Sequence, residues 1–191
     1  MAIAERSEIR AVPVLKWWWW LWLAGPTGIA SAMTLLAAVP PGGHFFGIMA
    51  AVAIWLFAGV VWFILLVVSR DFRRRNWITL TPVVAAVTVT LVIVGVPMRT
   101  AFLISEPALT AYVESLPKDH DSVWTDRFVG LFPIRSVYRT GNAVLLDVDG
   151  SGGLLEQCGF AYSPHSQVKD LPVSTEDHLT GNWYVTCTDF D

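Results

Sequence analysis

Charged residues are scarce in this chain and are missing altogether from three long stretches. Asp, Glu, Lys and Arg make up 15% of the 191 residues, against about 25% in an average soluble domain. Residues 17–39, 45–68 and 78–97 contain none of them. Each stretch is predominantly apolar and reaches the ~20 residues that a helix needs to cross a hydrocarbon core. The sequence therefore predicts a membrane protein with three transmembrane helices.

What these stretches lack also argues against several activities. Ion pathways and proton relays place ionisable side chains inside the spans, and intramembrane haem needs facing histidines, whereas only His44 lies near the membrane. The C-x-x-C-H motif of covalent haem, the Walker loop and the G-x-G-x-x-G loop are all missing. We expect no cofactor and no nucleotide, and because the second half of the chain is acidic, no nucleic acid as partner.

The distribution of charge predicts the orientation. Residues 1–97 hold seven Lys/Arg and three Asp/Glu, a net charge of +4, whereas residues 98–191 hold six and thirteen, a net charge of −7. Because basic loops stay in the cytoplasm, we expect a cytoplasmic arm at 1–16, a three-helix region at 17–97 in a cell membrane, and an extracytoplasmic domain at 98–191. The basic loop between the second and third spans is formed mainly by Arg70, Arg73, Arg74 and Arg75.

Tryptophans gather where the first span begins. Indole rings favour the headgroup layer of a bilayer, so this cluster is predicted to fix the depth and tilt of the first helix. The residues are Trp17, Trp18, Trp19, Trp20 and Trp22.

Small residues recur at every fourth position in two of the spans. Ala24, Gly28 and Ala32 form such a row in the first span, and Gly47 and Ala51 form a shorter one in the second. Small-xxx-small rows let another helix approach closely. The pattern fits two interpretations, packing of the three spans against each other or packing against a separate membrane protein.

After residue 98 the pattern becomes that of a small α+β domain. Ser105 and Pro107 predict a helix over 106–116, with a capping hydroxyl and an early proline. Gly141 and Asn142 predict a hairpin turn. The segment 161–182 is expected to be an irregular excursion. We therefore predict one helix packed on an antiparallel sheet, with strands at 128–132, 134–139, 143–148, 154–160 and 183–188.

Only two cysteines occur, Cys158 and Cys187, and both fall in the half predicted to be extracytoplasmic. Disulfides persist outside the cytoplasm. We expect a single bridge between them, with two buried thiols in neighbouring strands as the alternative.

An acidic, glycine-rich segment resembles the first half of a calcium loop. Asp147, Asp149 and Ser151 occupy positions 1, 3 and 5, with glycine at position 6. Position 12, where an EF-hand places a bidentate Glu, is Cys158, and Glu156 comes two residues early. A plain glycine-rich turn that carries acidic residues is therefore the favoured interpretation, with a calcium site as the alternative. A hydrolytic set of Ser163, His165, Asp170 and His178 matches no nucleophile motif.

Four segments of the second half carry a resemblance to a known family. They are Ser105–Leu109, Val129–Ile134, Gly159–Pro164 and Gly181–Tyr184. In these segments the chain is similar to a family of uncharacterised small membrane proteins of high-GC Gram-positive bacteria. The resemblance implies a bacterial plasma-membrane location and an extracytoplasmic domain, and it supplies no catalytic residue. The cysteine pair does not belong to the shared pattern.

The sequence thus favours a protein that is not an enzyme. We expect an accessory or interaction subunit of a larger bacterial membrane complex, of respiratory or envelope type, which has the lipid bilayer and other membrane subunits as partners. The alternative is a membrane-anchored extracytoplasmic sensor domain that binds a ligand or calcium through Asp147, Asp149, Ser151 and Glu156.

Overall fold

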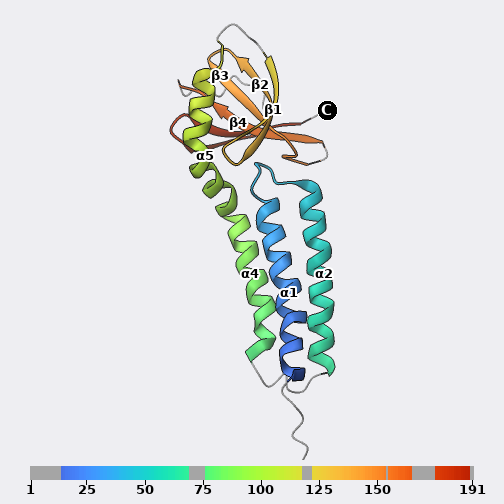
Figure 1. The fold of residues 1–191 in the computed structure, drawn as a ribbon. Helices are drawn as coiled ribbons and strands as arrows, with labels where there is room; N and C mark the ends of the chain where they lie inside the picture. The colour runs from blue at the N-terminus through green and yellow to red at the C-terminus, as the bar shows by residue number, and fades with distance from the viewer. Residues whose placement is uncertain (1–13, 69–75, 118–121, 154, 165–174, 190–191) are drawn as a thin grey trace, which may run out of the picture.

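The chain folds into a row of helices that carries a sheet domain at one end (Figure 1). The computed structural model describes residues 14–68, 76–117, 122–153, 155–164 and 175–189. Helical elements come first, followed by the strands. They are α1 (Val14–Ala37), α2 (Phe45–Val68), η1 (Asn76–Thr79), α4 (Leu80–Ile93), α5 (Val96–Ser115), β1 (Ser122–Val129), β2 (Phe132–Thr140), β3 (Ala143–Val148), β4 (Glu156–Tyr162), β5 (Thr175–Thr180) and β6 (Trp183–Asp189).

The helices match the predicted apolar stretches to different degrees. Helix α2 has the bounds predicted for the second span, and it is long and apolar enough to cross a membrane by itself. The part of α1 whose side chains are described, Leu21–Ala37, is apolar but shorter. Helices α4 and α5 meet this standard only as a pair, which is bent by 51°. Length and composition of the described residues therefore indicate one membrane-crossing helix, or two if the bent pair is a single span.

The predicted third span ends early because a glycine interrupts the helix. Gly95 adopts a left-handed conformation with φ of 74° and ends α4, a conformation that residues with a Cβ disfavour. Helix α5 then begins at Val96, with Pro97 in its first turn, where the missing N–H costs nothing. The change of direction carries α5 onto the sheet.

Buried positions in the helical part repeat every seven residues. They are Leu23, Ala30 and Ala37 in α1, Ala51, Ala58 and Leu65 in α2, and Thr81 and Thr88 in α4, and Thr27 of α1 is buried in addition. A seven-residue period keeps one seam of a helix against its neighbour, as in coiled coils. Helix α1 is the middle helix, between α4 and α2 (Figure 1).

Polar side chains connect these helices. The Thr88 hydroxyl donates to Ser31 Oγ at 3.1 Å, and the Trp55 indole donates to Thr34 Oγ1 at 3.0 Å. Thr27 Oγ1 and Thr81 Oγ1 lie 3.4 Å apart. Hydrogen bonds of this kind, together with close packing, hold helices together where no hydrophobic driving force exists between them.

The sheet has six antiparallel strands in the order β1-β2-β3-β4-β6-β5. This confirms the predicted α+β domain and the turn at Gly141 and Asn142, which joins β2 to β3. The expected irregular excursion at 161–182 is wrong in its last part, because Thr175–Thr180 forms the edge strand β5 along β6. Strand β1 also begins six residues earlier than predicted, at Ser122.

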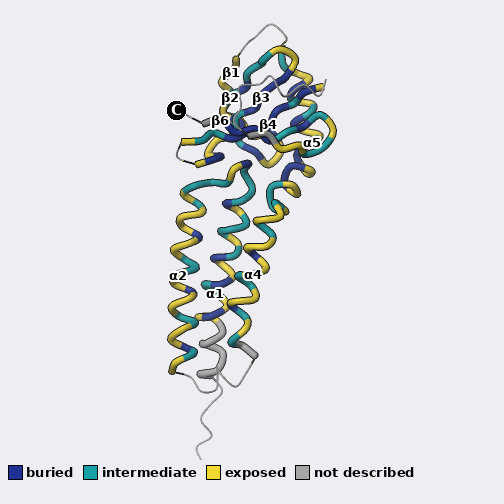
Figure 2. The backbone as a smooth tube through the Cα atoms, turned by 180° about the vertical axis from the view of Figure 1, so that it is seen from behind, coloured by how far each residue is buried: buried dark blue, intermediate teal, exposed yellow. Residues whose placement is uncertain are grey.

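Helix α5 covers one face of the sheet and forms the main core with it. The Phe102 ring packs against Phe160 and Trp183, with ring centroids 5.3 and 5.8 Å apart. Leu109 and Val113 extend the same buried face. Figure 2 shows that buried residues concentrate in α5 and the sheet, whereas the other helices are largely exposed or intermediate.

The predicted start of this helix at 106 is wrong by ten residues. Ser105 is buried in the middle of α5 and does not cap it, and Pro107 lies inside the helix. The Ser105 hydroxyl instead accepts the N–H of Leu131 at 2.9 Å. Packing of Phe102 and Leu109 on the sheet stabilises the helix through the proline, which local sequence preference alone would not do.

Candidate functional site

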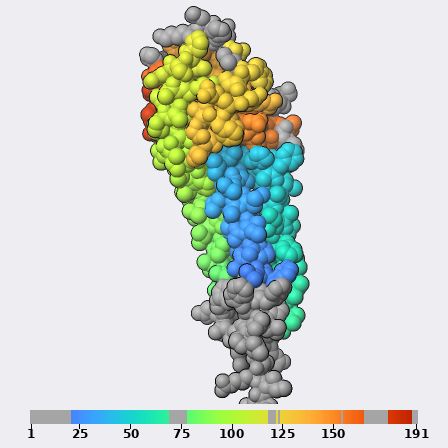
Figure 3. Space-filling model, viewed as in Figure 1, coloured from blue at the N-terminus to red at the C-terminus, as the bar shows by residue number. Residues whose placement is uncertain are grey.

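The small-residue row of α1 lies on an uncovered face of the middle helix. Ala24, Gly28 and Ala32 are all exposed, whereas the face of α1 that carries Leu23, Thr27 and Ala30 is buried. A Cβ added to Gly28 would meet no atom within 4 Å. Figure 3 shows α1 uncovered between α4 and α2 on the side that faces the viewer. Within the described chain, nothing packs against Gly28.

The small-residue row of α2, Gly47 and Ala51, packs against α1 instead of being exposed. A Cβ added to Gly47 would come within 2.9 Å of the Ala37 Cβ atom on α1, and Ala51 is buried. These small residues let α1 and α2 approach each other closely. Of the two interpretations of the sequence, packing within the chain therefore applies to Gly47 and Ala51. The row of α1 is not covered by the described part of the chain.

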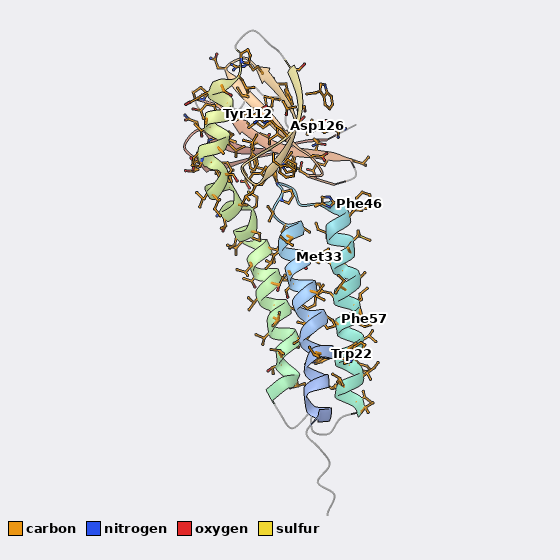
Figure 4. The ribbon with its side chains drawn as sticks, viewed as in Figure 1. Trp22, Met33, Phe46, Phe57, Tyr112 and Asp126 are labelled. Atoms are coloured by element: carbon orange, nitrogen blue, oxygen red, sulfur yellow. A yellow bond between two sulfur atoms is a disulfide. The ribbon has the colours of Figure 1, made fainter. Side chains whose placement is uncertain are left out.

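Large apolar side chains cover the outside of the helices. Phe46 and Phe57 project from the outer side of α2 (Figure 4), and Val83, Val87 and Ile93 are exposed on α4. The buried seams hold mainly alanine and threonine instead, with Leu23 and Leu65 as the larger residues. This inside-out distribution of size and polarity differs from that of a water-soluble bundle, in which the large apolar residues face inward.

Two predicted groups fall largely outside what the structure describes. Arg70, Arg73, Arg74 and Arg75 lie outside the described residues, as do the side chains of Trp17, Trp18, Trp19 and Trp20. Trp22 is described and is 45% exposed. The interfacial anchor and the basic topological loop therefore stay predictions.

The turn between α1 and α2 is hydrogen-bonded to the β3–β4 loop at the base of the sheet domain. Gly152, in the β3–β4 loop, donates its N–H to the Gly43 carbonyl at 2.9 Å, and His44 forms a parallel bridge with Gly152. The His44 Nδ1 atom accepts the N–H of Gly47 at 3.0 Å and so satisfies the first turn of α2. Pro41 is fully buried. The helical hairpin and the domain are thus in direct contact, without a linker.

The predicted disulfide between Cys158 and Cys187 is confirmed. The two residues are direct register partners on β4 and β6, with Cα atoms 4.1 Å apart. Both are buried next to the junction with the helical hairpin.

Two of the four predicted calcium ligands, Asp147 and Ser151, are engaged inside the fold, whereas Asp149 is exposed and Glu156 is half-buried. Asp147 accepts a hydrogen bond from Ser136 at 2.6 Å. Burial raises the pKa of this carboxyl, and the Ser136 hydroxyl, Arg135 and Tyr138 lower it by less. Ser151 is buried, and the single proton of its hydroxyl is shared between the carbonyl oxygens of Val148, at 2.7 Å, and Cys158.

The donor groups do not converge on a metal position. Among the residues that the structure describes, the only group of three or more His, Cys, Asp or Glu with ligand atoms within 4.8 Å of one another is Glu156 with Cys158 and Cys187. Its two sulfurs are bonded to each other and are not thiolate ligands. No observation therefore favours the calcium-sensor alternative.

The hydrolytic set is described only in part. Ser163 is buried and donates its backbone N–H to the Asn182 carbonyl at 2.8 Å. His178 lies on the edge strand β5, with Nε2 3.0 Å from the Gly181 carbonyl oxygen. His165 and Asp170 lie outside the described residues.

Comparison with protein-family models, with curated proteins and with solved structures found no match for this chain.

Proposed function

We propose that this chain is a non-catalytic integral membrane protein that acts as an accessory subunit of a larger membrane complex. Its α1, α2 and α4 cross the bilayer, its N-terminus lies in the cytoplasm, and the sheet domain lies on the outer face. The α1 row of Ala24, Gly28 and Ala32 contacts a helix of a partner subunit. The observation that carries the proposal is the exposure of this row on the middle helix.

The inside-out surface supports insertion of all three helices. Helix α2 has 24 residues, which corresponds to ~36 Å at ~1.5 Å per residue and exceeds a hydrocarbon core of about 30 Å. Because α1 and α4 pack alongside α2 with equally exposed apolar side chains, a bilayer that surrounds α2 also surrounds them. In water, so large an apolar surface would cause association.

The distribution of charge supports the orientation. In the sequence, the basic residues of the first half flank or follow the start of α1 and fill the interval between α2 and η1. The start of α1 and the end of α2 lie at the end of the helical part remote from the sheet. The positive-inside rule assigns that end to the cytoplasm. The opposite end carries the disulfide, which is consistent with an oxidising compartment.

The row itself supports a protein partner. Lipid-facing positions of these helices carry mostly large side chains, whereas Ala24, Gly28 and Ala32 leave the α1 backbone accessible. Close backbone approach is how small-xxx-small rows promote association between helices in lipid.

A pull-down with two matched glycine variants tests this proposal. Gly28 and Gly59 are both exposed helical glycines, and a Cβ on either meets nothing within 4 Å. The tagged full-length chain, Gly28→Leu and Gly59→Leu are extracted from the native membrane in a mild detergent, and the co-purifying proteins and particle masses are determined. We expect stoichiometric partners with the wild type and Gly59→Leu, and loss of them with Gly28→Leu.

Each other outcome counts against the proposal. Recovery of the chain alone, as monomer or homo-oligomer, would overturn the accessory role. Equal partner recovery with both variants would remove the α1 row as the contact surface.

A further inference from the structure

The exposed surface of α5 changes character part of the way along the helix. Its exposed large apolar residues are Val96, Leu103 and Ile104. Beyond Ile104 its exposed residues are Pro107, Ala108, Ala111, Glu114 and Ser115. The change falls at Ser105, about two and a half turns after α5 begins at Val96.

The β1–β2 turn lies at this same level. Leu131 donates its N–H to Ser105 Oγ, and Gly130 is so close to Ser105 that a Cβ there would come within 2.5 Å of its Cβ atom. Leu131 in this turn and Phe128 at the end of β1 are both more than half exposed. Large apolar side chains are therefore exposed at the β1–β2 turn, which contacts α5 at Ser105, where the exposed apolar part of α5 ends.

The β3–β4 loop lies at the same end of the sheet. In an antiparallel sheet ordered β1-β2-β3-β4 the β1–β2 and β3–β4 connections share one end, and the β2–β3 turn lies at the other. The β3–β4 loop bonds to the α1–α2 turn through Gly152 and Gly43. Leu155 in this loop is 72% exposed, as exposed as Phe46 at the start of α2.

Helix length fixes where this end of the domain stands relative to a bilayer. The α1–α2 turn directly precedes α2, and a membrane crossed by α2 ends at the level of this turn. Because the β3–β4 loop is bonded to the turn, the base of the sheet domain lies at the outer surface of the membrane.

We propose that the base of the sheet domain is itself a lipid-binding surface. Its apolar rim, defined as Leu103, Ile104, Phe128, Leu131 and Leu155, lies in the boundary between headgroups and acyl chains of the outer leaflet. The inference rests on the proposed insertion of the helices and adds a second point of attachment. Apolar faces of interfacial helices are buried at this depth. The side chain of exposed Arg99, one turn before Leu103, is long enough to extend to the lipid phosphates.

The opposite end of the sheet provides a contrast. Gly141 and Asn142 form the β2–β3 turn and are exposed, and neither is a large apolar residue. Trp124, which pairs with Ser136 in the middle of β2, is 71% exposed on the edge strand β1. The other large apolar residues exposed in the described part of the sheet, Phe128, Leu131 and Leu155, lie at the end from which the helices emerge.

Site-directed spin labelling of the full chain in phosphatidylcholine–phosphatidylglycerol vesicles tests the inference. Both native cysteines are bonded to each other, so a label reacts only with an introduced cysteine. Four variants are compared: Val60→Cys at an exposed position in the middle of α2, Leu131→Cys and Leu155→Cys on the rim, and Asn142→Cys at the far end. Accessibility to oxygen, which concentrates in lipid, is measured against that to a water-soluble nickel chelate.

We expect oxygen to relax the labels at Val60, Leu131 and Leu155 preferentially and the nickel chelate to relax the label at Asn142. Nickel accessibility at Leu131 and Leu155, with Val60 still in lipid, would overturn the inference and leave membrane insertion intact. Shielding of the rim labels from both reagents would show that a second copy of the chain covers the rim, which also overturns it. Nickel accessibility at Val60 would instead refute the insertion of α2.

Discussion

Gly42 lies directly against Cys158, so that a Cβ atom on Gly42 would approach the Cys158 sulfur to 2.5 Å. The first residue belongs to the turn between α1 and α2, and the second belongs to the disulfide between β4 and β6. The contact joins the helical hairpin to the pair of strands that the disulfide links. Changes on either side of it are therefore expected to affect the stability of the whole chain.

Gly42→Ala is predicted to destabilise the protein more than Gly141→Ala. Both glycines have positive φ, 72° and 59°, so both substitutions carry the left-handed penalty of ~1–2 kcal/mol. Only Gly42 is in tight contact, since a Cβ on Gly141 meets nothing within 4 Å. Overpacking adds ~1–3 kcal/mol. Thermal unfolding of the detergent-solubilised proteins measures the difference, and equal losses in the two variants would contradict the contact.

Removal of the disulfide is predicted to lower the free energy of unfolding by about 3–4 kcal/mol in the chain-entropy model. The bridge joins residues 29 positions apart, and it closes the segment that contains β5. Cys158→Ala/Cys187→Ala should therefore unfold at a lower denaturant concentration than the wild type. A reductant should destabilise the wild type and leave the double variant unchanged. A reduced wild type that keeps its full stability would refute this role.

Asp147→Asn is predicted to stabilise the protein at neutral pH. Burial raises the pKa of the Asp147 carboxyl above its usual value, so the folded state binds more protons than the unfolded state between the two pKa values. The free energy of unfolding then falls as pH rises through this interval. Asp147→Asn lacks this pH-dependent loss of stability. Its advantage over the wild type in the free energy of unfolding should therefore be largest above the interval.

The measurement is the melting temperature of the wild type, Asp147→Asn and Asp149→Asn as a function of pH. The advantage of Asp147→Asn should shrink as the pH is lowered below the interval. Asp149 is exposed, and its variant should follow the wild type throughout. A destabilised Asp147→Asn at neutral pH would show that the hydrogen bond from Ser136 outweighs the burial of charge.

The sequence predicts those parts of the fold that depend on short-range composition. The bounds of α2 could be read directly, because an uninterrupted apolar run between the glycine turn and a basic loop leaves little choice. The hairpin at Gly141 and Asn142 follows from turn chemistry in the same way, since Gly141 adopts the positive φ that the turn requires.

Parts that depend on distant neighbours were missed. Strand β5 reads Thr-Glu-Asp-His-Leu-Thr, too polar to predict a strand, and its pairing comes from β6 beside it. Ser105 followed by Pro107 has the local pattern of a helix start, but the helix continues through it because Phe102 and Leu109 are buried on the sheet. Tertiary packing overrides local preference at both sites.

The candidate site shows the same division. Small residues at intervals of four identified both rows, yet their spacing cannot tell which row faces the chain itself, because that depends on how α1 lies between α4 and α2. The contact of the α1–α2 turn with Gly152 had no sequence signal beyond two adjacent glycines. The threonines of the buried seams were also overlooked, although Thr81 and Thr88 stand seven residues apart.

Thr88→Val is predicted to loosen the packing of α4 on α1, whereas Thr90→Val is predicted to have little effect. Both hydroxyl oxygens lie 2.8 Å from the carbonyl oxygen four residues earlier, but only the Thr88 hydroxyl shares its proton with Ser31 Oγ, at 3.1 Å. A hydrogen bond between helices in lipid contributes ~0.6 kcal/mol on average and up to ~1.7 kcal/mol. Denaturant unfolding from mixed micelles should therefore separate the two variants by an amount in this range. A double-mutant cycle with Ser31→Ala assigns the difference, because Thr88→Val should cost less once Ser31 Oγ is gone, and a cost that is independent of Ser31 would exclude this hydrogen bond as its cause.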